Sequence, residues 1–314
     1  MPGAERALIT GGAGHVGGGI ARALLDAGWA VRVLDLRAPG PALARRVEAV
    51  AGDVRDPATV RDAAAGCDLV VHAAMQYEGS LQQLTELAIR GVEACAGTGR
   101  RLVYVGSCAA VGECDPAEFP QGKDERHWAT DSGAYGTAKV AAERRLQELM
   151  EDGVDAVAIN PAMVIGPHDP TGTASNRRVL GLAKIARFAP AFDGGLGVVD
   201  VADVGAAAVA AVAAPGARYL LCAHNLSMTG LLTAIRQSQG RRGPPRWRLP
   251  SPALLAAMRV QETAFDRLGQ APPVRTEQVQ RRLKQVAWFD SSLARRELAW
   301  TPRPLAETLR DLLG

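Results

Sequence analysis

Residues 7–35 read A-L-I-T-G-G-A-G-H-V-G-G-G-I-A-R-A-L-L-D-A-G-W-A-V-R-V-L-D: an apolar run, a glycine-rich turn, a helical segment, a second apolar run and an aspartate. Gly11, Gly14 and Gly17 form a G-x-x-G-x-x-G series. The first glycine permits a tight turn, the second lets backbone N–H groups approach a pyrophosphate, and the third lets helix and strand pack closely. The stretch therefore predicts a strand–helix–strand unit that binds a dinucleotide.

The aspartate at the end of this stretch bears on which dinucleotide is bound. Asp35 ends the second apolar run, where a carboxylate can hold the adenosine ribose hydroxyls. It should repel a 2′-phosphate, which favours NAD as the cofactor. Arg37 would attract that phosphate, unless it is solvated or stacked on the adenine, so NADP stays possible.

Composition excludes several classes of protein. A net charge of +3, with arginine pairs scattered along the chain, is too small for a nucleic-acid binder. The five cysteines form no Cys-x-x-Cys pair and the histidines have no metal-ligand spacing, so we expect neither disulfides nor a metal. The first strand leaves no room for a signal peptide, and the Ala-rich run at 204–214 is too short to cross a bilayer. We expect a cytoplasmic protein that binds no membrane.

The order of apolar runs and turn signals predicts an α/β fold. Expected strands are Ala7–Thr10, Ala30–Asp35, Val47–Ala51, Leu69–His72, Leu102–Gly106, Ala156–Asn160, Val198–Val201 and Tyr219–Cys222. Expected helices include Val16–Ala27, which ends at Gly28, a segment around Val179–Arg187 and Ser251–Leu268, and a glycine-rich loop is expected at Gly194, Gly195 and Gly197.

This alternation predicts a Rossmann-type doubly wound parallel sheet with a smaller C-terminal substrate lobe. The dinucleotide-binding domain is expected over residues 1–165, completed by about 195–225. The substrate lobe is expected over 166–194 and 226–314.

A tyrosine and a lysine lie four residues apart at the start of a helical run. Tyr135 and Lys139 would share one helix face. A lysine ammonium favours the phenolate and so lowers a tyrosine pKa from its usual value near 10. Such a tyrosine can exchange a proton with a carbonyl or alcohol oxygen while hydride moves to or from a nicotinamide.

With these motifs the sequence resembles the extended branch of the short-chain dehydrogenase/reductase superfamily, the NAD-dependent epimerase/dehydratase family. The resemblance covers nearly the whole chain and includes T-G-G-A-G-H-V-G at 10–17, G-D-V-R-D at 52–56, V-H-A-A at 71–74, R-L-V-Y-V-G-S at 101–107 and V-D-V-A-D-V at 199–204. N-P-A-M-V-I-G-P at 160–167 looks more like the dihydroflavonol-reductase and hydroxysteroid-dehydrogenase relatives than the sugar-nucleotide epimerases.

The resemblance implies a catalytic set and a cofactor set. The catalytic set is Ser107, Tyr135 and Lys139. The cofactor set is Gly11, Gly14, His15, Val16, Gly17, Asp35, Leu36, Arg37, Asp53, Val54, Ala73, Ala74, Tyr135, Lys139, Pro161 and Val164. The side chain of His15 is expected to serve packing. A homodimer is expected from the family's habit of pairing the tyrosine helix with a partner copy.

Two positions depart from the family pattern. The serine motif usually carries consecutive hydroxyl residues, but here it reads Gly106-Ser107-Cys108. Counting from the strand places Ser107 at the hydroxyl position, whereas counting back from Val111 places Cys108 there. A hydroxyl donates the better hydrogen bond, which favours Ser107. Ala88 stands where the family often has an asparagine of a proton relay.

Three hypotheses for function follow. The first is an oxidoreductase that reduces a ketone or oxidises a secondary alcohol, with Tyr135 as acid and base. The second is a nucleotide-sugar epimerase or dehydratase that recycles its NAD, and the third is a non-catalytic dinucleotide sensor. The substrate is not readable from the sequence beyond a small carbonyl or alcohol compound.

Overall fold

The structure is a computed structural model that describes residues 5–118, 120–191, 193–245, 247–270, 272, 275–277, 280, 283 and 286–314. The predicted ranges 1–165 and 226–314 each include some residues outside this described part.

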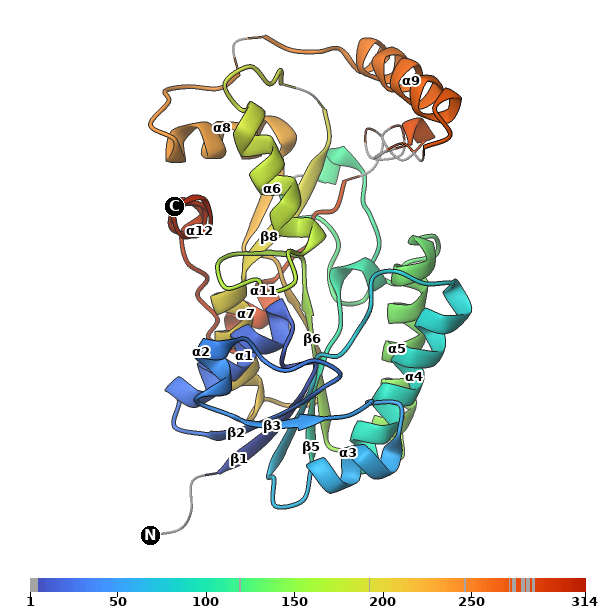
Figure 1. Ribbon diagram of the computed structural model, residues 1–314, viewed down its shortest axis with the longest axis vertical. Helices are drawn as coiled ribbons and strands as arrows, with labels where there is room; N and C mark the ends of the chain where they lie inside the picture. Colours follow the sequence, from blue (N-terminus) through green and yellow to red (C-terminus); the bar gives the residue numbers. More distant parts are fainter. Residues whose placement is uncertain are drawn as a thin grey trace.

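A seven-stranded sheet forms the centre of the molecule, and all its neighbouring strands are parallel (Figure 1). Its order is β3-β2-β1-β4-β5-β6-β9. The strands are β3 (Glu48–Ala51), β2 (Ala30–Asp35), β1 (Arg6–Thr10), β4 (Leu69–His72), β5 (Arg101–Val105), β6 (Ala156–Pro161) and β9 (Arg218–Leu221). The strand order runs from β1 to β2 and β3 on one side, and from β4 to β5 and β6 on the other. The topological switch point, where sheets of this kind bind ligands, therefore lies between β1 and β4. The predicted doubly wound fold is confirmed.

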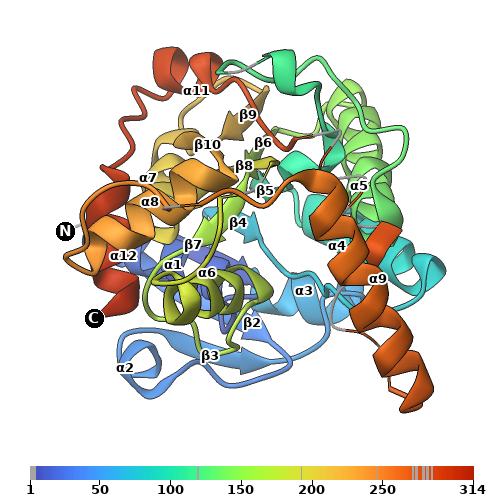
Figure 2. The ribbon, with the colours of Figure 1, turned by 90° about the horizontal axis from the view of Figure 1, so that it is seen from above.

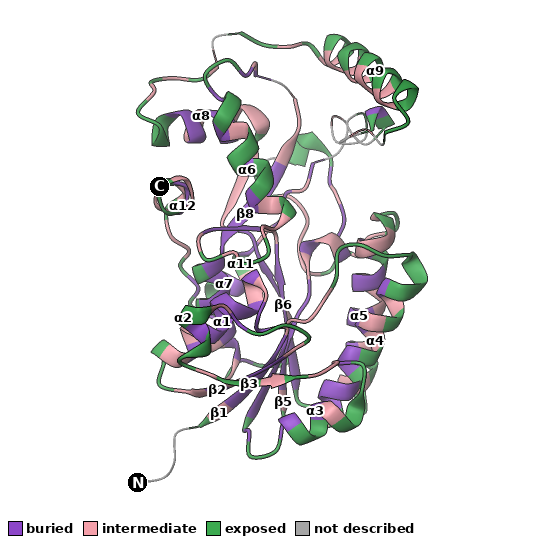
Figure 3. Ribbon diagram, in the orientation of Figure 1, coloured by how far each residue is buried: buried purple, intermediate pink, exposed green. Residues whose placement is uncertain are grey.

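Helices cover both faces of this sheet, and its inner strands β1, β4, β5 and β6 are almost entirely buried, whereas the edge strand β3 is mostly exposed (Figure 3). On one face α1 (His15–Asp26) packs against α7 (Val201–Ala211) in a core that also takes Ala294 of α11 (Ser292–Glu297). On the other face lie α3 (Pro57–Ala63), α4 (Leu81–Ala96) and α5 (Gly133–Glu151). The short α2 (Pro41–Ala44) follows β2.

A second, smaller sheet lies beyond the carboxyl end of the first, in the order β10-β8-β7. Its strands are β7 (Met163–Ile165), β8 (Gly195–Asp200) and β10 (His224–Ser227). It shares a core with α6 (Ala174–Ile185), α8 (Met228–Ser238) and α12 (Leu305–Leu313). Helix α9 (Ser251–Arg267) extends away from the rest and has no buried residue (Figures 1 and 2).

Three expectations for the second half need correction. Gly195 and Gly197 lie in β8 and not in a loop, and they are glycines because a Cβ would meet the Trp288 ring at 2.5 Å or the Cys222 sulfur at 2.5 Å. Within the segment 195–225, β9 joins the larger sheet and α7 packs in its core, whereas β8 joins the smaller sheet. Helix α6 begins at Ala174, where the Thr173 hydroxyl caps it.

The remaining predicted strands and helices lie within a residue or two of their observed bounds. Within the described ranges, no helix is both long and apolar enough to span a membrane. The same residues contain no group of three or more potential metal ligands.

Candidate active site

The glycine turn lies at the carboxyl edge of the larger sheet and is packed too closely for side chains. Gly11 has a positive φ of 74°, and a Cβ there would lie 2.6 Å from the Ala74 backbone. A Cβ on Gly17 would lie 2.2 Å from the Gly11 carbonyl oxygen. A Cβ on Gly14 would meet only that oxygen, at 3.3 Å, so the outer face of the turn is otherwise open. The turn therefore fits a pyrophosphate held by backbone N–H groups at the start of α1.

Asp35 is fixed at the mouth of this site by the backbone. Its two oxygens accept hydrogen bonds from the N–H groups of Ala13 and Arg37, each at 3.1 Å. A carboxylate has about four acceptor positions, so two remain for ribose hydroxyls. The Arg37 side chain is exposed. Asp53 is paired with Arg55, and the resulting hydrogen bonds hold the pKa of its carboxyl below the usual range.

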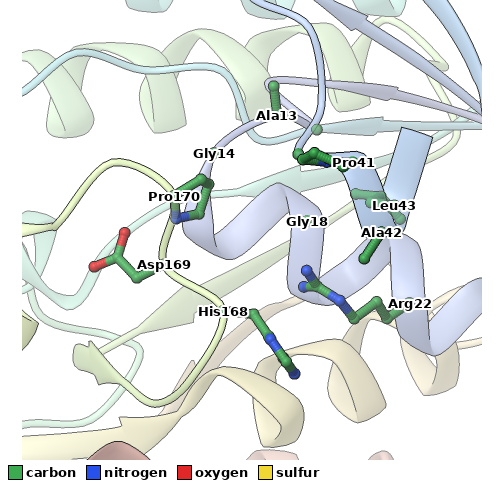
Figure 4. A pocket seen from close by; sticks show the side chains of 12 residues that line it. Ala13, Gly14, Gly18, Arg22, Pro41, Ala42, Leu43, His168, Asp169 and Pro170 are labelled. Atoms are coloured by element: carbon green, nitrogen blue, oxygen red, sulfur yellow. The ribbon is translucent and has the colours of Figure 1, made fainter. Parts of the chain in front are cut away.

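A pocket of about 240 Å³ opens beside the turn (Figure 4). It is lined by Gly12–Gly14, Gly18, Arg22, Gly40–Leu43 and His168–Pro170. The sequence did not predict that residues of α2 and of the loop after β7 line this pocket. Arg22 follows Gly18 by one helical turn, which is the signal that could have placed it here.

His15 connects the glycine turn to the loop after β7. The side chain is buried, and its Nε2 lies 3.3 Å from the Pro167 carbonyl oxygen. Burial lowers the pKa of this imidazole and so favours the neutral form. The predicted packing role matches this geometry.

Ser107 and Tyr135 come together at the same edge of the sheet. Ser107 follows β5 and caps the short 3₁₀ helix at 108–110, while Tyr135 lies in the first turn of α5. The start of α5 packs against the short helix that Ser107 caps, and the Ser107 hydroxyl acts to lower the pKa of Tyr135 while the Tyr77 phenol acts to raise it. Cys108 instead points into the core, where its thiol donates to the Asn160 carbonyl at 3.0 Å. The Cys108 thiol is thus engaged in the core, and Ser107 stays the predicted hydroxyl residue of the site.

Lys139 lies beneath this site and is only 3% exposed. Its Nζ donates to the Val105 carbonyl at 2.9 Å and to the Tyr104 hydroxyl at 3.4 Å. Burial lowers the pKa of Lys139 to about 8, while the nearby Glu143 carboxylate opposes the shift. The lysine is therefore still mostly charged at neutral pH.

The lowered tyrosine pKa that sequence analysis expected is not found here. Burial, together with Tyr77, raises the pKa of Tyr135 well above its usual value near 10. The ammonium of Lys139 is directed at Val105 and Tyr104 and has no hydrogen bond to the Tyr135 hydroxyl. Desolvation of the phenol therefore outweighs the charge that lies one turn away.

A buried ion pair lies behind the lysine. The Arg218 guanidinium donates to the Glu143 carboxylate at 2.5 Å, and the Asn160 amide donates to it at 2.7 Å. Arg218 also donates to the carbonyls of Glu125 and His127. These contacts tie α5, β6 and β9 to the loop that leads toward the tyrosine.

The ion pair explains why position 106 has no hydroxyl. A Cβ on Gly106 would lie 2.3 Å from Asn160 Oδ1 and 2.7 Å from Glu143 Oε1. The space that a serine side chain would need is filled by this buried polar pair. The other departure, Ala88, is buried in α4 and brings no polar side-chain atom toward Lys139.

The remaining predicted cofactor residues lie along the carboxyl edge of the sheet. Ala73 and Ala74 follow β4 and face Gly11, and Pro161 ends β6. Val54 and Val164 are buried in the two cores. Leu36 is exposed after β2.

Comparison with known proteins agrees with this geometry. Residues 7–217 match the family described as the NAD-dependent epimerase/dehydratase family. The chain is 31% identical over 250 residues to cinnamoyl-CoA reductase 1 of Arabidopsis thaliana, covering 70% of this chain and 71% of that protein. It is 29% identical to a 3β-hydroxysteroid dehydrogenase/Δ5→4-isomerase of Mycobacterium tuberculosis, covering 95% and 86% of the two chains. The crystal structure of gox2253 superposes with a TM-score of 0.79 at 26% identity, covering 98% of this chain and 97% of that one.

We expect Gly17→Ala to disrupt both fold and cofactor binding, because its Cβ would meet the Gly11 carbonyl at 2.2 Å. Overpacking of this kind costs about 1–3 kcal/mol. The melting temperature should fall by several degrees and the Kd for NAD should rise about tenfold or more. Gly18→Ala is the matched control, since its Cβ would make contacts of 3.4 Å or longer. Equal effects of the two substitutions would contradict this account.

We expect Glu143→Gln to lower the free energy of unfolding by about 3 kcal/mol, because removing one partner of a buried ion pair leaves the other charge uncompensated. Urea unfolding at pH 7 measures this loss. The exposed Glu148, which pairs with Arg145 on the same helix, is the control. Glu148→Gln should cost less than about 1 kcal/mol. Similar losses of unfolding free energy in both variants would contradict the prediction that the buried Glu143–Arg218 pair contributes more to stability than an exposed pair.

Proposed function

The chain belongs to the NAD-dependent epimerase/dehydratase family, and we propose that it is an NAD(P)-dependent oxidoreductase that reduces a ketone or oxidises a secondary alcohol. The observation that carries the proposal is that the start of α5, which holds Tyr135, packs against the short helix that Ser107 caps after β5, at the sheet edge that also holds the glycine turn. The prediction of NAD is confirmed at the level of the family, whose description names this cofactor.

In the proposed reaction, the bound dinucleotide supplies or accepts a hydride. Tyr135 donates its proton to the substrate oxygen during reduction and takes a proton back during oxidation. Ser107 donates a hydrogen bond to the same oxygen and orients it. The Asn160 amide, 3.4 Å from the Ser107 carbonyl oxygen, helps to fix the backbone of the serine.

Lys139 has two proposed roles. Its ammonium stabilises negative charge on the nearby Tyr135 oxygen when the proton leaves. It also holds the nicotinamide ribose, which would replace part of its present contact with Tyr104. Glu143 favours the charged lysine, so the buried ion pair supports both roles.

The remaining assignments complete the proposal. The smaller sheet, with α6, α8 and α12, would form the substrate lobe against the dinucleotide-binding domain. Helices α4 and α5 pack side by side and would also form the surface of a homodimer. We also propose a cytoplasmic location, with which the five buried, unpaired cysteines are consistent.

We expect Tyr135→Phe to lower kcat about 10²- to 10⁴-fold on any ketone that the wild-type protein reduces with NADH, since positioned proton transfer contributes that much. The Kd for NADH should change less than about twofold. Cys108→Ala is the control and should keep its activity, because that thiol bonds to Asn160 in the core. Full activity of Tyr135→Phe would exclude the mechanism. Copurified NAD that turns over without net consumption would favour the epimerase alternative.

Asp35 should set the preference between the two dinucleotides. Asp35→Asn removes the charge that repels a 2′-phosphate but keeps an acceptor for the Ala13 N–H group. The ratio of the Kd for NADPH to that for NADH should therefore fall about tenfold, which corresponds to roughly 1.4 kcal/mol. Fluorescence titration of both reduced dinucleotides measures this ratio without a substrate. An unchanged ratio would show that Asp35 does not select the cofactor.

A further inference from the structure

A second phenol, that of Tyr77, lies against the phenol of Tyr135. The two rings are stacked, with centroids 4.5 Å apart and planes 13° from parallel. The Tyr77 phenol is close enough to act on the Tyr135 hydroxyl, whose pKa it raises. Tyr77 is 66% exposed to solvent, whereas Tyr135 is half-buried. The stacked pair therefore places an exposed phenol between the proposed acid and the surface.

The loop that carries Tyr77 is held at both ends. At its start, the Ala73 N–H group donates to the Thr10 carbonyl at 3.0 Å, next to the glycine turn. At its end, Ser80 and Gln83 form a reciprocal capping box at the N-terminus of α4. The loop that carries Tyr77 is thus anchored on both sides, by Ala73 and by Ser80.

The proposed reaction needs such a connection to water. Each reduction would remove one proton from Tyr135, and the proton must return before the next turnover. On the inner side, Lys139 donates to a backbone carbonyl and to Tyr104, and Tyr104 is only 1% exposed. Burial also raises the pKa of the Tyr104 hydroxyl well above its usual value. These inner partners offer no contact with solvent.

We propose that Tyr77 carries protons between solvent and Tyr135, an inference that rests on the proposed function. In reduction, the Tyr135 O–H bond breaks as its proton passes to the substrate oxygen. The Tyr135 oxygen then takes the proton of Tyr77, and Tyr77 takes one from a buffer acid in solvent. Oxidation of an alcohol runs the same transfers in reverse. Tyr77 is unchanged at the end of each cycle, and no electrons pass through it.

The test is Tyr77→Phe, which keeps the stacked ring and removes only the hydroxyl. With NADH and a ketone that the wild-type protein reduces, kcat in dilute buffer should fall about tenfold or more. The KM for NADH and the melting temperature should stay close to wild type. Adding imidazole buffer should restore the rate of Tyr77→Phe in proportion to its concentration, because imidazolium can deliver the proton directly. Tyr77→His, which restores a proton carrier at this position, should recover part of kcat without added imidazole.

The outcomes separate this inference from the proposed function. Wild-type kcat for Tyr77→Phe in dilute buffer would overturn the relay alone. A loss of rate that imidazole does not restore, and that Tyr77→His shares, would also overturn it and would assign Tyr77 to substrate contact. Full activity of Tyr135→Phe, or no ketone reduction by the wild-type protein, would overturn the proposed function and this inference with it. Tyr135→Phe itself should not be rescued by imidazole.

Discussion

The site depends on a close approach of backbone to backbone at the carboxyl edge of the larger sheet. Gly11 meets the Ala74 backbone and Gly17 meets the Gly11 carbonyl, each closer than a Cβ would allow. These approaches bring the start of α1 and the loop after β4 against each other. The same loop continues to Tyr77, whose ring stacks on that of Tyr135, so one short segment contacts both the dinucleotide turn and the tyrosine. Steric exclusion at two glycines thus links the cofactor edge to the proposed chemistry.

A second constraint operates on the other side of the tyrosine. Glu143 and Arg218 are 75 residues apart in the chain and form a buried pair completed by the Asn160 amide. The pair is costly to desolvate, and it is tolerated because several hydrogen bonds satisfy it. The cluster occupies the space that a side chain at position 106 would need. The Glu143 carboxylate favours the charged form of Lys139, and Arg218 donates hydrogen bonds to the loop at 125–127.

The features that sequence predicts well here are local ones. The glycine turn, the short apolar strands and the Tyr135–Lys139 spacing depend on residues near one another in the chain, and the structure contains all three close to where the sequence predicts them. The features that were missed depend on distant packing. Gly195 and Gly197 look like loop residues until Trp288 and Cys222 are seen against them. The Glu143–Arg218 pair and the stacked Tyr77 likewise have no signal in local spacing, because their partners lie on other elements.

The predicted pKa of Tyr135 was wrong for the same reason, because the groups that determine it lie on other elements of the fold. Helical spacing alone places an ammonium one turn from a phenol, but it carries no information about burial or about the other acceptors of the lysine. Here burial and Tyr77 keep the proton on Tyr135, and Lys139 stays charged with its pKa near 8. A phenol that retains its proton at neutral pH is ready to act as an acid. Under the proposed function, Tyr135 begins a reduction with its proton in place, whereas the oxidation of an alcohol needs the phenolate, which the raised pKa disfavours.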